Sequence, residues 1–253
     1  LSIEFDDYRE YAEGDDLRHL DWNVLARLEH PVVKTYRDEE DLAVHLFVDT
    51  SLSMAFGSPS KLDFAKQVAA ATGLVGLCGG DAVYVHKFGS RSKPERVLRG
   101  RAFFPRLARW LDGLEADGKR SISEEAKRFA ASEHRPGIAI IVSDGMDPEV
   151  VSSLKVLAGR GHEIYFLQVL SEIEVRPDIE GDLRLLDSES GDAVEITANS
   201  LTLEEYEKNL SEHCQAIKDE CLRTGGKYAQ LTSDTKIAEF VQEILRREGW
   251  VAA

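Results

Sequence analysis

The chain has 253 residues, of which 43% are hydrophobic, enough for one or two domains with a sizeable core. Its 46 acidic and 31 basic residues give a net charge of −15, which argues against non-specific binding to nucleic acid or to anionic membranes. No apolar run approaches the roughly 20 residues that a membrane-spanning helix needs. No signal peptide is visible either. We therefore expect a cytoplasmic protein that meets a membrane only through its partners.

The three cysteines do not predict a disulfide framework. Cys78, Cys214 and Cys221 lack the Cys-x-x-Cys spacing of metal and redox sites. Cys214 and Cys221 lie seven residues apart, on one face of a predicted helix. The pattern is typical of small buried side chains in a reducing compartment.

Residues 1–41 are polar and charged, with little apolar periodicity. They predict an extended arm with short helical pieces, packed on the main domain, with Trp22 as a buried apolar anchor. The charged side chains of the arm predict an ion-pair lattice that ties it to the main domain, because arginine pairs well with carboxylates. The alternative is an active site built from the same charges. These residues are Arg9, Asp15, Asp16, Arg18, Asp21, Arg27 and Glu39.

From residue 42 onward, strand and helix patterns alternate within one predicted domain, 42–253. The alternation predicts an α/β fold: a doubly wound, mostly parallel sheet with helices on both faces. The expected strands are 42–49, 82–88, 137–143 and 163–170, with short strands near 95–98 and 228–231. The expected helices are 61–77, 102–114, 122–133, 147–158, one from Thr202 to the glycines at 225 and 226, and 235–247. Residues 183–197 predict an inserted β-hairpin.

Two of the expected strands end in acidic and hydroxyl side chains. Asp49 follows the strand 42–48, and Ser51 and Ser53 come two and four residues later. Asp144 follows the strand 137–142. Open parallel sheets bind ligands at such strand ends, and hard oxygen donors suit Mg²⁺. The alternative interpretation is purely structural: these side chains hydrogen-bond to loop backbone and stabilise the loops, and Asp144 is an ordinary turn residue.

The spacing Asp49-x-Ser51-x-Ser53 resembles the metal-ion-dependent adhesion site of von Willebrand factor A domains. The resemblance implies that the two serines bind Mg²⁺ directly, with Mn²⁺ or Ca²⁺ as alternative ions. It also implies that Asp49 and Asp144 act mainly through water. An acidic residue of a partner would then fill an open coordination position, and we expect Gly145 to face that partner.

In that family a threonine from an intervening loop usually completes the ligands. Here the loop 117–122 places Arg120 at the threonine position, with Ser121 as the nearest hydroxyl. An inward Arg120 would disfavour a cation or replace it, and would contact a partner's acid. Ser121 as a ligand would preserve the site. Ser121 has a second interpretation, since with Glu124 it forms a capping box for the next helix.

A more specific resemblance covers nearly the whole chain. Residues 9–22, REYAEGDDLRHLDW, resemble the signature of the bacterial domain of unknown function family 58. Ala26-Arg27, Val33-Lys34, Glu39-Glu40 and the run 206–245 are similar to the same family. Members are typically encoded beside MoxR-type AAA+ ATPases. The resemblance therefore implies an adaptor or co-factor for such an ATPase in the maturation of a protein or complex.

The leading hypothesis is a non-enzymatic protein-binding module with an adhesion-like metal site. The chain has no Gly-x-x-x-x-Gly-Lys-Ser/Thr loop, so ATP chemistry belongs to the partner. A metal-dependent hydrolase is the alternative. Two observations count against a hydrolase. The chain has no Gly-x-Ser-x-Gly nucleophile motif, and Ser51 occupies the position where a dehalogenase-type phosphatase has an acid. A third interpretation is a scaffold with a vestigial metal site.

Overall fold

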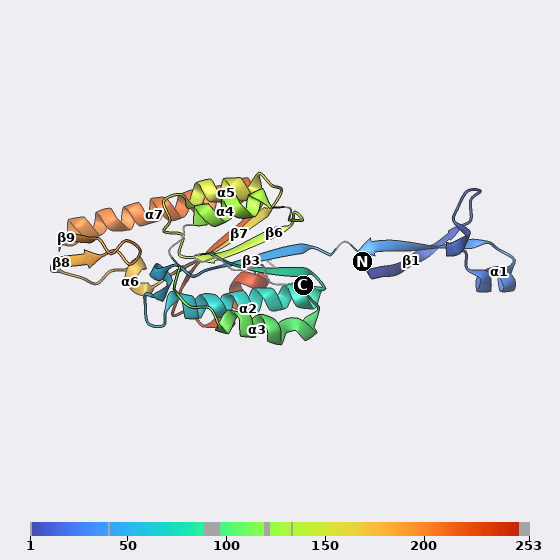
Figure 1. Ribbon diagram of the computed structural model, residues 1–253, viewed down its shortest axis with the longest axis horizontal. Coiled ribbons are helices and arrows are strands. Elements are labelled where there is room, and N and C mark those ends of the chain that lie inside the picture. The colour runs from blue at the N-terminus through green and yellow to red at the C-terminus, as the bar shows by residue number, and fades with distance from the viewer. Residues whose placement is uncertain (1, 40, 89–96, 119–121, 133, 248–253) are drawn as a thin grey trace. The chain divides into compact units, whose positions relative to one another are not determined.

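The computed structural model describes residues 2–39, 41–88, 97–118, 122–132 and 134–247. The chain divides into two compact units, Leu1–Asp41 and Leu42–Ala253 (Figure 1). Among the described residues, no helix combines the length and the apolar character that a membrane crossing requires.

The N-terminal unit, called the arm below, is a β-ribbon with a helical insert. Strand β1 (Ser2–Glu10) pairs antiparallel with β2 (Val32–Glu39). Between them lie the 3₁₀ turn η1 (Leu17–His19) and helix α1 (Trp22–Leu28). The arm is thus more regular than the sequence predicts, because ladder hydrogen bonds between two strands need no apolar stripe.

The arm contains the predicted ion pairs, but these pairs join arm residues to one another. Arg9 bonds Asp15 at 2.8 Å, and Arg18 bonds Asp16 at 2.6 Å. Trp22 is 62% exposed, so the arm does not by itself bury the expected anchor. The physical reason is that one short helix on a two-stranded ribbon provides no second layer to cover an indole ring.

Packing of the arm on the main domain remains a prediction. If Trp22 is covered by the main domain, its burial should contribute roughly 1.5–3 kcal/mol. Cutting the chain at a protease site inserted after Asp41 and removing the arm should then lower the melting temperature by several degrees. The uncut protein with the same insertion is the control. Equal melting temperatures would show that the arm does not stabilise the main domain.

The main unit contains a six-stranded sheet in the order β10-β7-β6-β3-β4-β5. Five strands run parallel, and the short β5 pairs antiparallel with β4 at one edge. This arrangement confirms the doubly wound fold and all four long strands predicted from the pattern. The strands are β3 (Ala43–Asp49), β4 (Ala82–Phe88), β5 (Leu98–Arg99), β6 (Ile138–Ser143), β7 (Glu163–Leu170) and β10 (Lys227–Thr232).

Helices cover both faces of this sheet, as Figure 1 shows. One face packs on α2 (Lys61–Gly79), α3 (Phe104–Asp112), α8 (Ile237–Glu239) and the π-helical η4 (Phe240–Arg247). The other face packs on α4 (Ile122–Ala131), α5 (Val150–Ala158) and α7 (Ser200–Arg223). Side chains alternate along a strand, so Leu46 and Val48 enter the first core and Phe47 the second.

The shorter elements lie near the strand ends. They are the 3₁₀ turns η2 (Leu52–Ala55) and η3 (Arg101–Phe103), helix α6 (Glu172–Val175), and the strands β8 (Gly181–Leu186) and β9 (Ala193–Ala198). Strands β8 and β9 form the predicted hairpin. Cys214 and Cys221 are buried as expected, Cys78 is exposed, and all three are free thiols.

Two helices begin elsewhere than predicted, because polar side chains have other partners. Helix α5 begins at Val150, since the carboxylate of Asp147 accepts the backbone N–H of Ile122 at 2.9 Å and that of Glu149 at 2.8 Å. Helix α7 is capped by Asn199, which accepts the N–H of Thr202 at 3.0 Å. Thr202 therefore lies inside the helix.

Four histidines surround Phe129 in the second core. His45 Nδ1 lies 3.3 Å from His86 Nε2, and His45 Nε2 lies 2.9 Å from the carbonyl of Arg135. The rings of His134 and His162 pack against that of His45. Burial lowers the pKa of His45 to about 4 and that of His86 to about 3. Both rings are therefore neutral in the folded protein near pH 7.

Stability should fall as the pH is lowered through 6.5. Unfolded histidines take up protons near a pKa of about 6.5, whereas His45 and His86 stay neutral in the folded chain, so acid favours unfolding. At about pH 5 the loss should be roughly 2 kcal/mol for each. Urea unfolding at about pH 7.5 and about pH 5 measures it. His86→Gln should show a smaller loss between the two pH values, and the exposed His30→Gln the same loss as the wild type.

Candidate functional site

The carboxyl ends of β3 and β6 meet where the strand order reverses. From β3 the sheet continues through β4 on one side and through β6, β7 and β10 on the other. Val48 is opposite Val142, which brings Asp49 beside Ser143. Ligands of doubly wound sheets bind at such a switch point. The topology thus brings together the two strand-end acids predicted from the sequence.

Asp49 is held by two hydrogen bonds in a buried position. Its Oδ1 accepts the N–H of Ser51 at 2.9 Å, and its Oδ2 accepts the hydroxyl of Ser143 at 2.5 Å. Only 3% of Asp49 is exposed. Burial raises its pKa, the negative charge of Asp144 raises it further, and the hydrogen bonds from Ser143 and Ser51 lower it. A cation at this point would relieve the unfavourable burial of two neighbouring acids.

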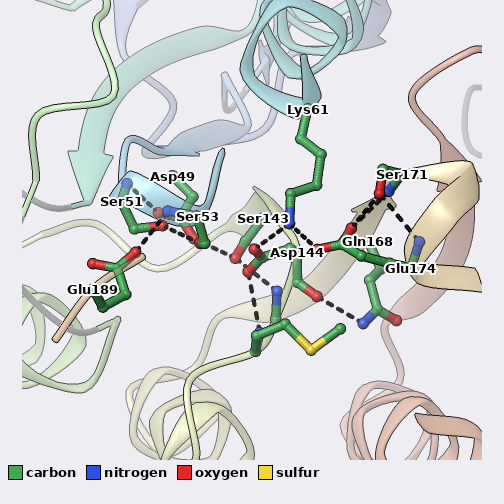
Figure 2. Close-up of polar contacts among 12 residues, drawn as sticks. Asp49, Ser51, Ser53, Lys61, Ser143, Asp144, Gln168, Ser171, Glu174 and Glu189 are labelled. Atoms are coloured by element: carbon green, nitrogen blue, oxygen red, sulfur yellow. Dashed lines mark hydrogen bonds and ion pairs between the residues drawn. The ribbon is translucent and has the colours of Figure 1, made fainter. Parts of the chain in front are cut away.

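The two serines of the predicted motif turn toward each other. The hydroxyl oxygens of Ser51 and Ser53 lie 3.1 Å apart, and both residues are partly accessible. Figure 2 shows a further carboxylate beside them. It belongs to Glu189, in the turn between β8 and β9, whose Oε1 accepts the backbone N–H of Ser53 at 2.8 Å. The Asp49-x-Ser51-x-Ser53 spacing does not point to this residue.

A buried lysine contacts the second acid. Lys61, the first residue of α2, donates to Asp144 Oδ2 at 2.8 Å and to Glu174 Oε1 at 2.6 Å (Figure 2). Its side chain is fully buried. Burial alone lowers the pKa of Lys61, but the charges of Asp144 and Glu174 outweigh burial and raise it. The lysine is therefore a charged ammonium. The only feature of the sequence that points to this role is the position of Lys61, directly before the apolar stripe that begins at Leu62.

Residues at and after the end of β7 also contact the site. Ser171 follows β7 and caps α6, and Glu174 Oε2 accepts both the N–H of Ser171 at 2.7 Å and its hydroxyl at 3.0 Å. The Nε2 of Gln168 donates to the backbone carbonyl of Asp144 at 2.8 Å. The loop after β6 is thus fixed by α2 on one side and by β7 on the other.

The other predicted site residues are less closely defined. Ser121 and Arg120 lie outside the described residues. The preceding Gly118 is beside the site, since its N–H donates to the carbonyl of Thr50 at 2.9 Å. Gly145 is buried with a φ of +70°, and its carbonyl accepts from His213 Nε2 at 2.6 Å. Its contact with a partner remains a prediction.

The oxygen atoms of the site suit a small, hard cation that is held by hydroxyls and water as well as by carboxylates. No group of three or more His, Cys, Asp or Glu side chains has metal-binding geometry within the described ranges. Two hydroxyls and two carboxylates nevertheless suit Mg²⁺, which keeps several waters. The ammonium of Lys61 already balances part of the charge of Asp144. The residues therefore fit a hydroxyl-rich site of low negative charge.

Removing the ammonium should destabilise the protein severely. Lys61→Met leaves the buried Asp144 and the partly buried Glu174 without their cation, which should cost about 3–5 kcal/mol. Lys66→Met, on the same helix but at a partly exposed position, is the matched control. The double variant Lys61→Met, Asp144→Asn should recover part of the loss, because one uncompensated charge is removed. Urea unfolding measures all four proteins. A Lys61→Met protein as stable as Lys66→Met would contradict the charge balance.

Comparison with known proteins gives relatives without an assigned function. An uncharacterized protein of Mycobacterium tuberculosis is 29% identical in an alignment that covers 96% of this chain and 80% of the relative. An uncharacterized protein of Mycobacterium bovis matches with the same identity and coverage.

Solved structures of low identity are similar to this chain, and one of them, a pilus adhesin, shares the fold over most of it. The pilus adhesin SpaC of Lactobacillus rhamnosus GG, in its open conformation, superposes with a TM-score of 0.51 at 11% identity, over 85% of this chain and 30% of the adhesin. A conserved hypothetical protein, BatB of Bacteroides thetaiotaomicron, has a TM-score of 0.49 at 19% identity, over 82% of this chain and 99% of BatB.

The sheet is the doubly wound, mostly parallel sheet that the sequence predicts, with Asp49 and Asp144 at adjacent strand ends. The family model described as "Protein of unknown function DUF58" matches residues 7–216, which is most of the chain. The chain therefore belongs to the DUF58 family of proteins of unknown function.

Proposed function

We propose that this chain is a non-enzymatic protein-binding module, whose strand-end site holds Mg²⁺ and binds an acidic residue of a partner. The observation that carries the proposal is the meeting of Asp49 with the 143–144 strand end at the switch point, beside the paired hydroxyls of Ser51 and Ser53. Partly accessible hydroxyls beside buried acids favour binding of a cation from solvent.

Each residue has a distinct part in this proposal. Ser51 and Ser53 would hold the ion directly, and Asp49 and Asp144 would hold it through water, with Mn²⁺ or Ca²⁺ as substitutes. When bound, the ion attracts a carboxylate as a Lewis acid. Lys61 strengthens that attraction, because an Asp144 already paired with an ammonium neutralises the ion less.

The same contacts disfavour a hydrolase. The hydroxyl of Ser51 is hydrogen-bonded to that of Ser53, and an alcohol is too weak a base to activate another. The amine of Lys61 is protonated and held by two carboxylates, so it does not act as a base. The proposal therefore assigns binding, and no turnover, to this chain.

The partner in this proposal is a MoxR-type AAA+ ATPase or its client in the cytoplasm, as the family resemblance implies. The net charge of −15 repels an acidic partner at long range. Attraction must then be local to the cation. Binding should therefore depend strongly on Mg²⁺ and only weakly on monovalent salt.

A scaffold with a vestigial site is the second candidate, and the buried ammonium of Lys61 favours it. Lys61 Nζ contacts Asp144 and Glu174 directly, so part of the charge balance is met without a metal. In that case the strand ends are braced by permanent ion pairs, and divalent cations have no effect.

Metal binding separates the two candidates. At a hundredfold excess over its dissociation constant, a ligand of the folded state stabilises it by about 2.7 kcal/mol. Millimolar Mg²⁺ or Mn²⁺ should therefore raise the melting temperature of the wild type and of the exposed control Asp112→Asn, but not of Asp49→Asn. Calorimetry measures the shift. No shift in the wild type would favour the scaffold.

Partner binding is tested with a MoxR-type ATPase of the same organism. Its capture in a pull-down with this protein should succeed with Mg²⁺ and fail with a chelator. Asp49→Asn and Ser53→Ala should reduce capture at least as much as the chelator does. If neither the chelator nor the substitutions reduce the amount of ATPase captured, this site has no role in partner binding.

A further inference from the structure

One carboxylate at the site comes from the β8–β9 hairpin. Ser53 and Glu189 lie 136 residues apart in the chain, yet Glu189 Oε1 is 2.8 Å from the backbone nitrogen of Ser53. Figure 2 shows this carboxylate pointing toward Ser51 and Ser53. It stands beside the two hydroxyls that the proposed function gives to the cation.

An ordered turn presents Glu189. The Oδ1 of Asp187 accepts the N–H of Glu189 at 2.7 Å and that of Ser190 at 2.9 Å, and these bonds lower the pKa of Asp187. The N–H of Asp187 donates to the carbonyl of Asp192 at 2.8 Å, and Gly191 has a φ of +77°. The hairpin tip therefore has one defined shape that aims Glu189 at the serines.

The hairpin itself is lightly held. Strands β8 and β9 form a separate two-stranded sheet, in which Leu185 is paired with Val194. These two side chains are 46% and 59% exposed. A two-stranded ribbon with an uncovered apolar face is only marginally stable. Such a hairpin can exchange its contact at Ser53 for solvent.

We propose that Glu189 is an internal acidic ligand of the strand-end site, in the place that a partner's acidic residue takes. This inference rests on the proposed function. Without a cation, a further carboxylate near Asp49 and Asp144 is repelled. With a cation, Glu189 is held beside Ser51 and Ser53 by its bond to the N–H of Ser53. Partner binding is then an exchange, in which the hairpin tip releases Ser53 and the partner's acid takes the place of Glu189.

Manganese reports directly on this exchange. In the wild type, Glu189 should take one coordination position of bound Mn²⁺, so Glu189→Ala should bind Mn²⁺ with one more water, measured by proton relaxation. The affinity of Glu189→Ala for Mn²⁺ should be about tenfold lower than that of the wild type, because one charge-assisted contact is lost. Electron paramagnetic resonance of the free ion measures this affinity. Glu189→Gln keeps an acceptor oxygen without the charge and should behave like Glu189→Ala.

Acetate is the probe for the external acid. Acetate should bind the Mn²⁺-loaded Glu189→Ala protein about tenfold more tightly than the loaded wild type, since the competing internal acid is gone. Asp192→Asn removes an equal charge from the same hairpin turn and should match the wild type in water count, Mn²⁺ affinity and acetate affinity.

The outcomes distinguish the two proposals. Equal water counts and equal acetate affinities in the wild type and Glu189→Ala would overturn the internal ligand and leave the metal site standing. An Asp192→Asn protein that behaves like Glu189→Ala would also overturn it, since general charge would then explain the effect. A wild type that binds no Mn²⁺ would overturn both.

Discussion

The site depends on one constraint, which is that several ionised side chains are buried together where the strand order reverses. Asp49 and Asp144 come from adjacent strand ends, and the ammonium of Lys61 joins Asp144 to Glu174. Carboxylates in a low-dielectric environment require compensation. The first residue of α2, the Glu174 of the capping box at Ser171 and the loop after β6 supply the contacts that meet this requirement.

This arrangement explains why a metal site can be built here from few carboxylates. The lysine takes up one acid, and Ser143 fixes the other. The hydroxyls of Ser51 and Ser53 are left on the accessible side. A cation bound among them is only partly neutralised, which suits recognition of an anion better than hydrolysis of a bond.

The sequence predicted the sheet and half of the site. Alternating patterns located the four long strands, and the topology then required Asp49 and Asp144 to meet. Lys61, Glu174 and Glu189 were not predicted, because their contacts span 83 to 136 residues and follow no spacing rule. The start of α5 was misplaced because Asp147 bonds the N–H of Ile122, and the start of α7 because Asn199 caps the helix ahead of Thr202.

The contacts of Lys61 have a further consequence for how the chain acquires its structure. Its partners lie 83 and 113 residues further along, so they are synthesised after α2. Until β6 and α6 have docked, the ammonium and both carboxylates remain solvated. Non-local contacts of this kind form late. The strand-end face that we propose binds a partner should therefore be among the last parts of the domain to form, so a nascent or partly folded chain would not present it.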